Sequence, residues 1–224
     1  MDDELVVTIT VKADAPIKDW HIEIREPSSN LLFSEWRGDG DPPAQVVWNG
    51  KSASGELVQS ASDYPFSLTV TDTNGNYSVF EGFIQVDVLV IREGDVLRVQ
   101  VPSIVFGSNS GNMENLPSDI AANNDWILQR IAQVLNKFNT YQVKVEGHAN
   151  PTATTPAARQ REQDTELQPL SELRAKSVVE YLVKLGVARN RLTAYGIGGA
   201  RPLVKYEDRN NWWKNRRVEF ILVK

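Results

Sequence analysis

The second half of the chain holds an arginine whose position could form a binding site for an anion. Arg174 lies in the run Leu170-Ser171-Glu172-Leu173-Arg174-Ala175. Its planar guanidinium can hydrogen-bond both oxygens of a carboxylate. If Ser171 caps a helix, Arg174 falls in the first turn of that helix. The free N–H groups of a first turn favour a bound anion, whereas the helix dipole destabilises a cation there by roughly 0.3–1 kcal/mol. Two interpretations stay open: a carboxylate site, or an exposed arginine paired with an acid such as Glu172.

The residues needed for several kinds of catalysis are missing. The chain has no cysteine and two histidines, which excludes thiol catalysis, disulfide scaffolds and cysteine-based zinc sites. The segment 107–111 does not place a serine at the centre of a G-x-S-x-G turn, and 196–201 lacks the third glycine of a dinucleotide loop. His148 has no partners at metal-ligand spacing. We therefore predict no enzymatic activity, no cofactor and no metal.

Composition limits the remaining classes. The chain has 224 residues, of which 41% are hydrophobic and 24% charged, and no apolar run is long enough to span a membrane. Its acidic start has no apolar segment of the signal-peptide type. Residues 1–92 hold 6 Lys/Arg against 15 Asp/Glu, whereas 93–224 hold 18 against 14. This asymmetry indicates two domains, neither basic enough to predict nucleic-acid binding.

The first domain is predicted to be all-β. Apolar and polar residues alternate in the runs 7–11, 20–24 and 66–70, which is typical of strands with one buried face. Turn signals separate these runs, and no helical period occurs before about residue 115. We predict a β-sandwich over residues 1–92.

A set of turn and core residues in this domain resembles a known module. In order they are Trp48-Asn49-Gly50, Gly55, Tyr64-Pro65-Phe66 and Asp72-Thr73-Asn74-Gly75. They are similar to the immunoglobulin-like module of the flagellar hook-capping type. The resemblance implies an immunoglobulin-like sandwich that acts as a spacer or an interaction surface, with an envelope protein as a possible partner of this acidic module.

The second domain, residues 93–224, is predicted to mix helices and strands. Glu93-Gly94-Asp95 is taken as the boundary, and Leu97 to Phe106 reads as the first strand, interrupted by Pro102. Residues 127–138 follow helical spacing after a candidate cap at Asn123-Asn124-Asp125, and 175–182 follow it again. Further strands are expected at 143–147, 192–195 and 218–223. The order β-α-β-α-β-β predicts a two-layer α+β sandwich.

Motifs in this domain resemble the OmpA-like C-terminal family. They are Glu146-Gly147-His148, Leu170 to Val178, Tyr195-Gly196-Ile197-Gly198 and Asn215-Arg216-Arg217-Val218-Glu219. The resemblance covers about residues 97–224. It implies a periplasmic protein of the bacterial cell envelope that attaches non-covalently to the stem peptide of peptidoglycan.

The resemblance also assigns site residues. In the family, an Asp two residues after Gly-His binds the ammonium of diaminopimelate, and the Arg of L-S-x-x-R-A binds its carboxylate. Arg174 matches this Arg, and Asn150 stands at the Asp position. His148, Ser171 and Arg217 complete the candidate ligand-binding set. Because adjacent strand residues point to opposite faces, at most one of Arg216 and Arg217 is expected to reach the ligand.

Three departures alter the implied site. Asn150 lacks the charge of Asp, Leu167 replaces the polar Asn found seven residues before the Arg, and the stretch from Asn150 to Leu170 is several residues longer than usual. An extra loop is therefore expected to border or cover the pocket. Two hypotheses follow: altered peptidoglycan binding, for instance to a different diamino acid, or a degenerate pocket on a periplasmic scaffold that binds protein.

Overall fold

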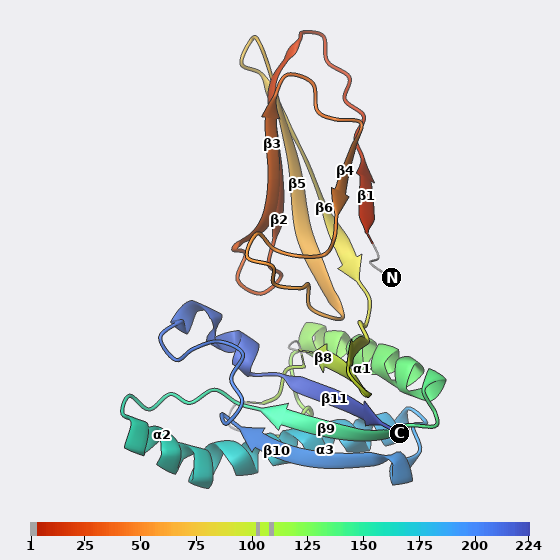
Figure 1. Ribbon diagram of the computed structural model, residues 1–224, viewed down its shortest axis with the longest axis vertical. Helices are drawn as coiled ribbons and strands as arrows, with labels where there is room; N and C mark the ends of the chain where they lie inside the picture. The colour runs from red at the N-terminus through yellow and green to blue at the C-terminus, as the bar shows by residue number, and fades with distance from the viewer. Residues whose placement is uncertain (1–3, 102–103, 108–109) are drawn as a thin grey trace. The chain divides into compact units, whose positions relative to one another are not determined.

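The computed structural model describes residues 4–101, 104–107 and 110–224, and the chain divides into two compact units (Figure 1). Unit 1 comprises Met1–Val58 and Ser62–Val86, and unit 2 comprises Gln59–Ala61 and Asp87–Lys224. The division falls earlier than the predicted boundary at residues 92 and 93. The reason is that strand β7 (Ile91–Glu93) pairs with β8 (Val96–Val101) of unit 2, so Glu93-Gly94-Asp95 lies at the turn of a hairpin.

Unit 1 is built from antiparallel strands. In chain order these are β1 (Leu5–Thr8), β2 (Ile17–Arg25), β3 (Leu32–Asp39), β4 (Gln45–Trp48), β5 (Ser62–Asp72) and β6 (Tyr77–Val86). Among the described residues they form a four-stranded sheet in the order β3-β2-β5-β6 and a two-stranded sheet, β1-β4.

The two sheets of unit 1 share an aromatic core. Trp48 of β4 packs edge-on against Phe33 of β3 and Tyr64 of β5, with ring centroids 6.2 Å from each, and Ile24 is buried beside them. The strands predicted from the alternation of apolar and polar residues are therefore confirmed, and they form sheets with one buried face. The more specific immunoglobulin-like sandwich stays a prediction.

Unit 2 contains one mixed sheet in the order β10-β9-β11-β8-β7. Its further strands are β9 (Gln142–His148), β10 (Leu192–Gly198) and β11 (Val218–Val223). β10 runs parallel to β9, and the other pairs are antiparallel. The predicted strand from Leu97 to Phe106 ends at Val101, and Pro102 lies outside the described residues.

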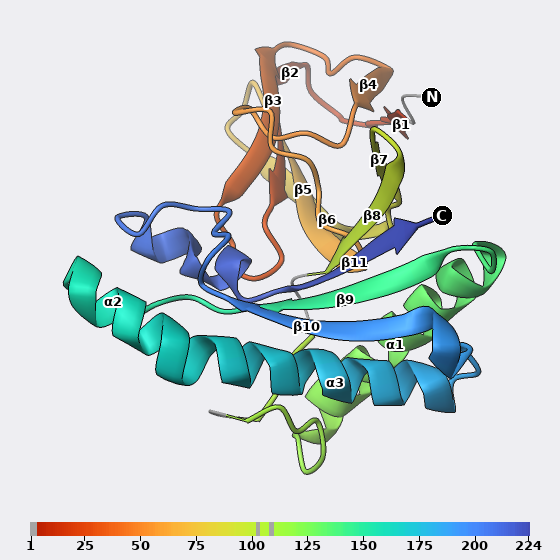
Figure 2. The ribbon, with the colours of Figure 1, turned by 60° about the horizontal axis from the view of Figure 1, so that its bottom comes forward.

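The helices α1 (Ser118–Lys137) and α3 (Gln168–Lys184) cover one face of this sheet (Figure 2). Residues of α1 at helical spacing are buried against the strands, including Ile127, Leu128, Ile131 and Leu135. The α1 helix starts at Ser118, so the predicted cap at Asn123-Asn124-Asp125 is wrong. Asn124 is instead buried inside the helix, where its side chain hydrogen-bonds the N–H and C=O of Val105.

The second long helix starts much earlier than predicted. The side chain of Thr155 caps α2 (Pro156–Glu162), which continues through a π-helical turn (Gln163–Leu167) directly into α3. No residue of α2 is buried, so it lacks the apolar period that would have indicated a helix. Pro169 follows the π turn and lies in the first turn of α3. A residue without an N–H is tolerated in the first turn of a helix.

Two glycines allow α3 to lie directly on the sheet. A Cβ on Gly147 of β9 would collide with the backbone carbonyl of Ser171, and a Cβ on Gly196 of β10 would collide with that of Gln168. The start of α3 is therefore held at backbone contact with the carboxyl ends of these two parallel strands.

A short piece of chain from between β4 and β5 completes unit 2. Ala61 is buried in its main core, and its N–H donates to the carbonyl of Asp87 at 3.3 Å. The hydroxyl of Ser60 accepts from the N–H of Leu89 at 3.0 Å.

Candidate functional site

Arg174 lies well inside the helix, not at its start. Since the helix begins at Pro156, the expected cap at Ser171 is wrong, and so is the placement of Arg174 in a first turn beside free N–H groups. Ser171 is fully buried, donates to the carbonyl of Gln168 at 2.9 Å and accepts from the N–H of Gly198 at 2.8 Å. Its hydroxyl thus links α3 to the end of β10 and is buried from solvent.

The Arg174 side chain is half-buried against a loop that precedes α1. Its Nε donates to the carbonyl of Ser110 at 3.1 Å, and the guanidinium lies 5.2 Å from the ring centroid of Phe106. Burial lowers the pKa of Arg174 from its usual value, and the nearby charge of Arg216 lowers it further. A negative group brought beside Arg174 would offset both effects.

Three arginines line one small pocket of about 30 Å³. Its walls come from Ile104, Phe106, Gly147, His148, Arg174, Arg216, Arg217 and Val218. Both Arg216 and Arg217 reach it, contrary to expectation, because they precede β11 and its alternation starts only at Val218. Within the described chain, Arg174 and Arg216 form no ion pair with a carboxylate, and the Nη1 of Arg217 is buried without a hydrogen-bond partner.

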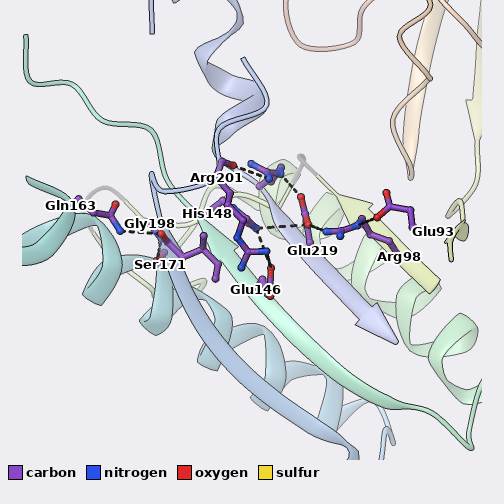
Figure 3. A network of polar contacts seen from close by, with 11 residues as sticks. Glu93, Arg98, Glu146, His148, Gln163, Ser171, Gly198, Arg201 and Glu219 are labelled. Carbon is purple, nitrogen blue, oxygen red and sulfur yellow. Dashed lines mark hydrogen bonds and ion pairs between the residues drawn. The ribbon is translucent and has the colours of Figure 1, made fainter. Parts of the chain in front are cut away.

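Behind this pocket lies a buried ionic network, seen in Figure 3. Glu146 on β9 stands opposite Glu219 on β11, and His148 is two residues beyond Glu146, on the same face. The Nε2 of His148 lies 3.8 Å from Glu146 and 3.9 Å from Glu219, and neither ring nitrogen has a hydrogen-bond partner.

Three guanidiniums neutralise the carboxylates of this network. Arg217 Nε donates to Glu219 at 2.6 Å, Arg98 also binds Glu219, and Arg201 lies 3.0 Å from Glu146. Although burial pushes the pKa of Glu219 upward, the charge and hydrogen bond of Arg217 hold it below its usual value.

The same surroundings keep His148 neutral. Its side chain is 1% exposed, and burial lowers its pKa to about 4, with the charge of Arg217 acting in the same direction. The ligand atoms of Glu146, His148 and Glu219 lie within 4.8 Å of one another, a spacing that a metal ion could use. However, Arg98, Arg201 and Arg217 already supply positive charge there, so a divalent cation would meet three like charges.

Asn150 lines a different and larger pocket, of about 610 Å³. Its Oδ1 accepts from the Nδ2 of Asn215 at 2.7 Å, and its Nδ2 donates to the carbonyl of Pro151 at 2.8 Å. The same pocket is lined by Arg159 and Gln160 of α2 and by Tyr206. The long stretch after Asn150 therefore builds a second pocket. The predicted residues divide accordingly: His148, Arg174 and Arg217 share the small pocket, Asn150 lines the large one, and Ser171 lines neither.

Sequence reasoning did not find the ionic network as a unit. Glu146 and His148 have the two-residue spacing of one strand face, and this is the signal that could have joined them. Their pairing with Glu219 and Arg98 depends on the sheet order, which spacing along the chain does not give.

Comparison with known proteins identifies a family for part of unit 2. Residues 117–216 match the family model of the OmpA family. The chain carries an OmpA-family domain. The resemblance predicted from the motifs is thereby confirmed for these residues, as is the α+β fold of the domain.

Relatives of the OmpA-family domain have been described in several bacteria. The peptidoglycan-associated lipoprotein of Mesorhizobium japonicum is 36% identical over 101 residues, which cover 45% of this chain and 55% of that protein. The peptidoglycan-binding protein ArfA of Mycobacterium tuberculosis is 29% identical over 119 residues, 53% of this chain and 32% of that protein. The chain thus matches about half, or less, of the length of these relatives.

Among solved structures, a MotB-like protein from Desulfovibrio vulgaris is similar, with 24% identity and a TM-score of 0.48 over 61% of this chain and 78% of the other. None of the described helices combines the length and apolar character needed to cross a membrane.

Proposed function

We propose that the chain attaches non-covalently to peptidoglycan in the periplasm of a bacterial envelope, and that Arg174 binds a carboxylate of the stem peptide. The OmpA-family match and the names of the two sequence relatives support this role. The acidic first unit then serves as a spacer or contacts another envelope protein.

The three guanidiniums around one pocket support the proposal most directly. Arg174, Arg216 and Arg217 place like charges together, and burial makes this arrangement costly without an anion. A carboxylate would accept hydrogen bonds from the planar fork of Arg174 and reduce the repulsion from Arg216.

The size of the pocket restricts what enters it. A volume of about 30 Å³ is roughly that of one water molecule in the liquid, so only the tip of a ligand fits. The rest of the stem peptide must lie outside, and the 610 Å³ pocket beside Asn150 is large enough for a neighbouring amino acid.

A second candidate function is a scaffold that kept the fold and lost the ligand. Asn150 favours it, because its side-chain oxygen is already bound by Asn215 and it carries no charge for an ammonium. In that case the second unit contacts proteins in the envelope and does not retain peptidoglycan.

Co-sedimentation with purified peptidoglycan tests the two functions. We expect the wild-type chain to sediment, and Arg174→Ala to lose about tenfold or more in affinity, since charge-assisted hydrogen bonds contribute roughly 1.5–3 kcal/mol. Arg161→Ala, at an exposed position of α2, is the matched control and should behave as wild type. Thermal unfolding of each variant checks that the fold is intact. Absence of retention in the wild type would favour the scaffold.

A further inference from the structure

Strand β6 forms one edge of the four-stranded sheet of unit 1. The N–H of Asp72 bonds the carbonyl of Asn76, and the pairing of β5 with β6 continues from this bond in one register. The even-numbered residues of β6 therefore bond to β5, and the odd-numbered ones direct N–H and C=O groups to the free edge. No other part of the described chain hydrogen-bonds these outward groups. Such an edge is a template for a further strand.

The side chains of β6 are unusually apolar for an edge. Tyr77 is 73% exposed, Val79 49%, Phe80 63% and Phe83 68%. The strand contains no lysine or proline and pairs with β5 without a bulge, so the common protections of an edge are missing.

The opposite edge, β3, has those protections. It carries Glu35, Arg37 and Asp39, and its pairing with β2 is interrupted by a bulge. The two edges of the same sheet thus differ in the features that prevent strand addition. By this contrast, β6 is the edge of this sheet that is open to a further strand.

We propose that β6 pairs antiparallel with β6 of a second copy, about a two-fold axis at Phe80. In this register Tyr77 stands opposite Phe83 of the partner subunit, Val79 opposite Glu81 of the partner subunit, and Phe80 opposite Phe80 of the partner subunit. Odd-numbered residues meet odd-numbered residues, so the outward N–H and C=O groups of both strands bond each other. The exposed aromatic residues all acquire aromatic partners.

The exposed apolar area favours this occupant, and the position of Glu81 favours this register. An axis at Glu81 would place two carboxylates opposite each other, which is destabilising, whereas the axis at Phe80 keeps them apart. A large aromatic side chain offers roughly 150–250 Å². At the stated exposures, Tyr77, Val79, Phe80 and Phe83 of two copies bring roughly 900 Å² together before the backbone is counted. Stable interfaces bury upward of about 1,000 Å².

The two copies carry like charge, and this predicts how salt acts. Unit 1 holds 5 Lys/Arg against 14 Asp/Glu, so the two copies repel each other. Because salt screens this repulsion, the dimer should strengthen as salt is added. A basic strand from another protein would dissociate under the same change.

The first test is the oligomeric state of the full chain. Analytical ultracentrifugation measures it at rising protein concentration and at rising salt concentration. We expect a reversible dimer, at least tenfold weaker in Phe83→Lys. Leu32→Lys is the matched control, because Leu32 is 46% exposed on edge strand β3, and it should dimerise as wild type. A monomer at every concentration, a dimer that salt dissociates, or equal weakening by both variants would overturn the proposal.

The register has its own test, since the chain contains no cysteine. Phe80→Cys places two thiols at a non-hydrogen-bonded pair with Cα atoms about 4.5 Å apart, within disulfide range. We expect a disulfide-linked dimer under mild oxidation. In Glu81→Cys the two sulfurs belong to residues displaced along the strands and should not bridge. Equal crosslinking of both variants would overturn the register.

Discussion

At the scale of single residues, Asn150 differs from an aspartate by one charge. Its oxygen accepts from Asn215 and its nitrogen donates to the carbonyl of Pro151. A carboxylate at this position would keep the first bond and lose the second, and it would present negative charge to the 610 Å³ pocket.

We expect Asn150→Asp to raise affinity for diaminopimelate-containing peptidoglycan about fivefold, because a charged hydrogen bond exceeds a neutral one by roughly 1 kcal/mol. Co-sedimentation measures this change, and Asn190→Asp, exposed on the short helix Arg189–Arg191, is the control. No gain would mean that the walls built by α2, and not the lost charge, keep an ammonium away.

His148 makes stability depend on pH in a definite direction. Burial lowers its pKa from 6.5 to about 4, so between these values the unfolded chain binds a proton that the folded chain does not. The free energy of unfolding should therefore fall as pH falls through this window, by at most about 3 kcal/mol, and His148 adds nothing further below it. The charged groups that face the His148 ring are Glu146, Glu219, Arg98, Arg201 and Arg217.

Urea unfolding between pH 4 and 7 measures this dependence. His148→Gln should flatten this dependence. An unchanged slope in His148→Gln would assign the dependence to the carboxylates.

At the scale of elements, the sequence predicted strands better than helix starts. β11 was predicted at 218–223 and spans Val218–Val223, because a buried strand is marked by a run of apolar residues, interrupted here only by Glu219. No residue of α2 is fully buried, so it shows no apolar period and only Thr155-Pro156 marks its beginning. This is why Ser171 was taken for a cap.

The candidate site was also predictable only in part. Motif residues such as His148 and Arg174 can be proposed as site residues by resemblance, but the pocket that each one lines cannot be predicted in this way. Asn150 and Arg174 line different pockets, and the walls of the larger one come from α2 and from the segment that includes Asn215, which lie far apart in the chain.

Because α3 lies in backbone contact with the sheet, a single methyl group added at Gly147 should reduce the stability of the protein. Gly147→Ala should destabilise the protein by about 3 kcal/mol or more, because the new Cβ would meet the carbonyl of Ser171 and the helix backbone cannot yield as a side chain would. Chemical denaturation measures the loss. Gly107→Ala is the control, because its Cβ would have no neighbour nearer than 3.6 Å. Equal stability of both variants would mean that α3 can shift outward.

At the scale of the whole molecule, the net charge of −5 opposes non-specific adhesion to a wall rich in carboxylates. If binding depends on Arg174, moderate salt should therefore increase retention of the wild type, because it screens this repulsion while the half-buried contact is screened less. Arg174→Ala should stay weak at low and moderate salt in the same co-sedimentation assay. Retention that falls steadily with salt would instead indicate surface adhesion by basic patches.

The short piece Gln59–Ala61 has a practical consequence for anyone dividing this protein. A fragment starting at Asp87 would lack the buried methyl group of Ala61. The carbonyl of Asp87 would lose its donor, the N–H of Ala61, and the N–H of Leu89 would lose its acceptor, the hydroxyl of Ser60. The second unit is therefore not a continuous stretch of sequence, and an expression fragment that ignores this would be missing part of its own interior.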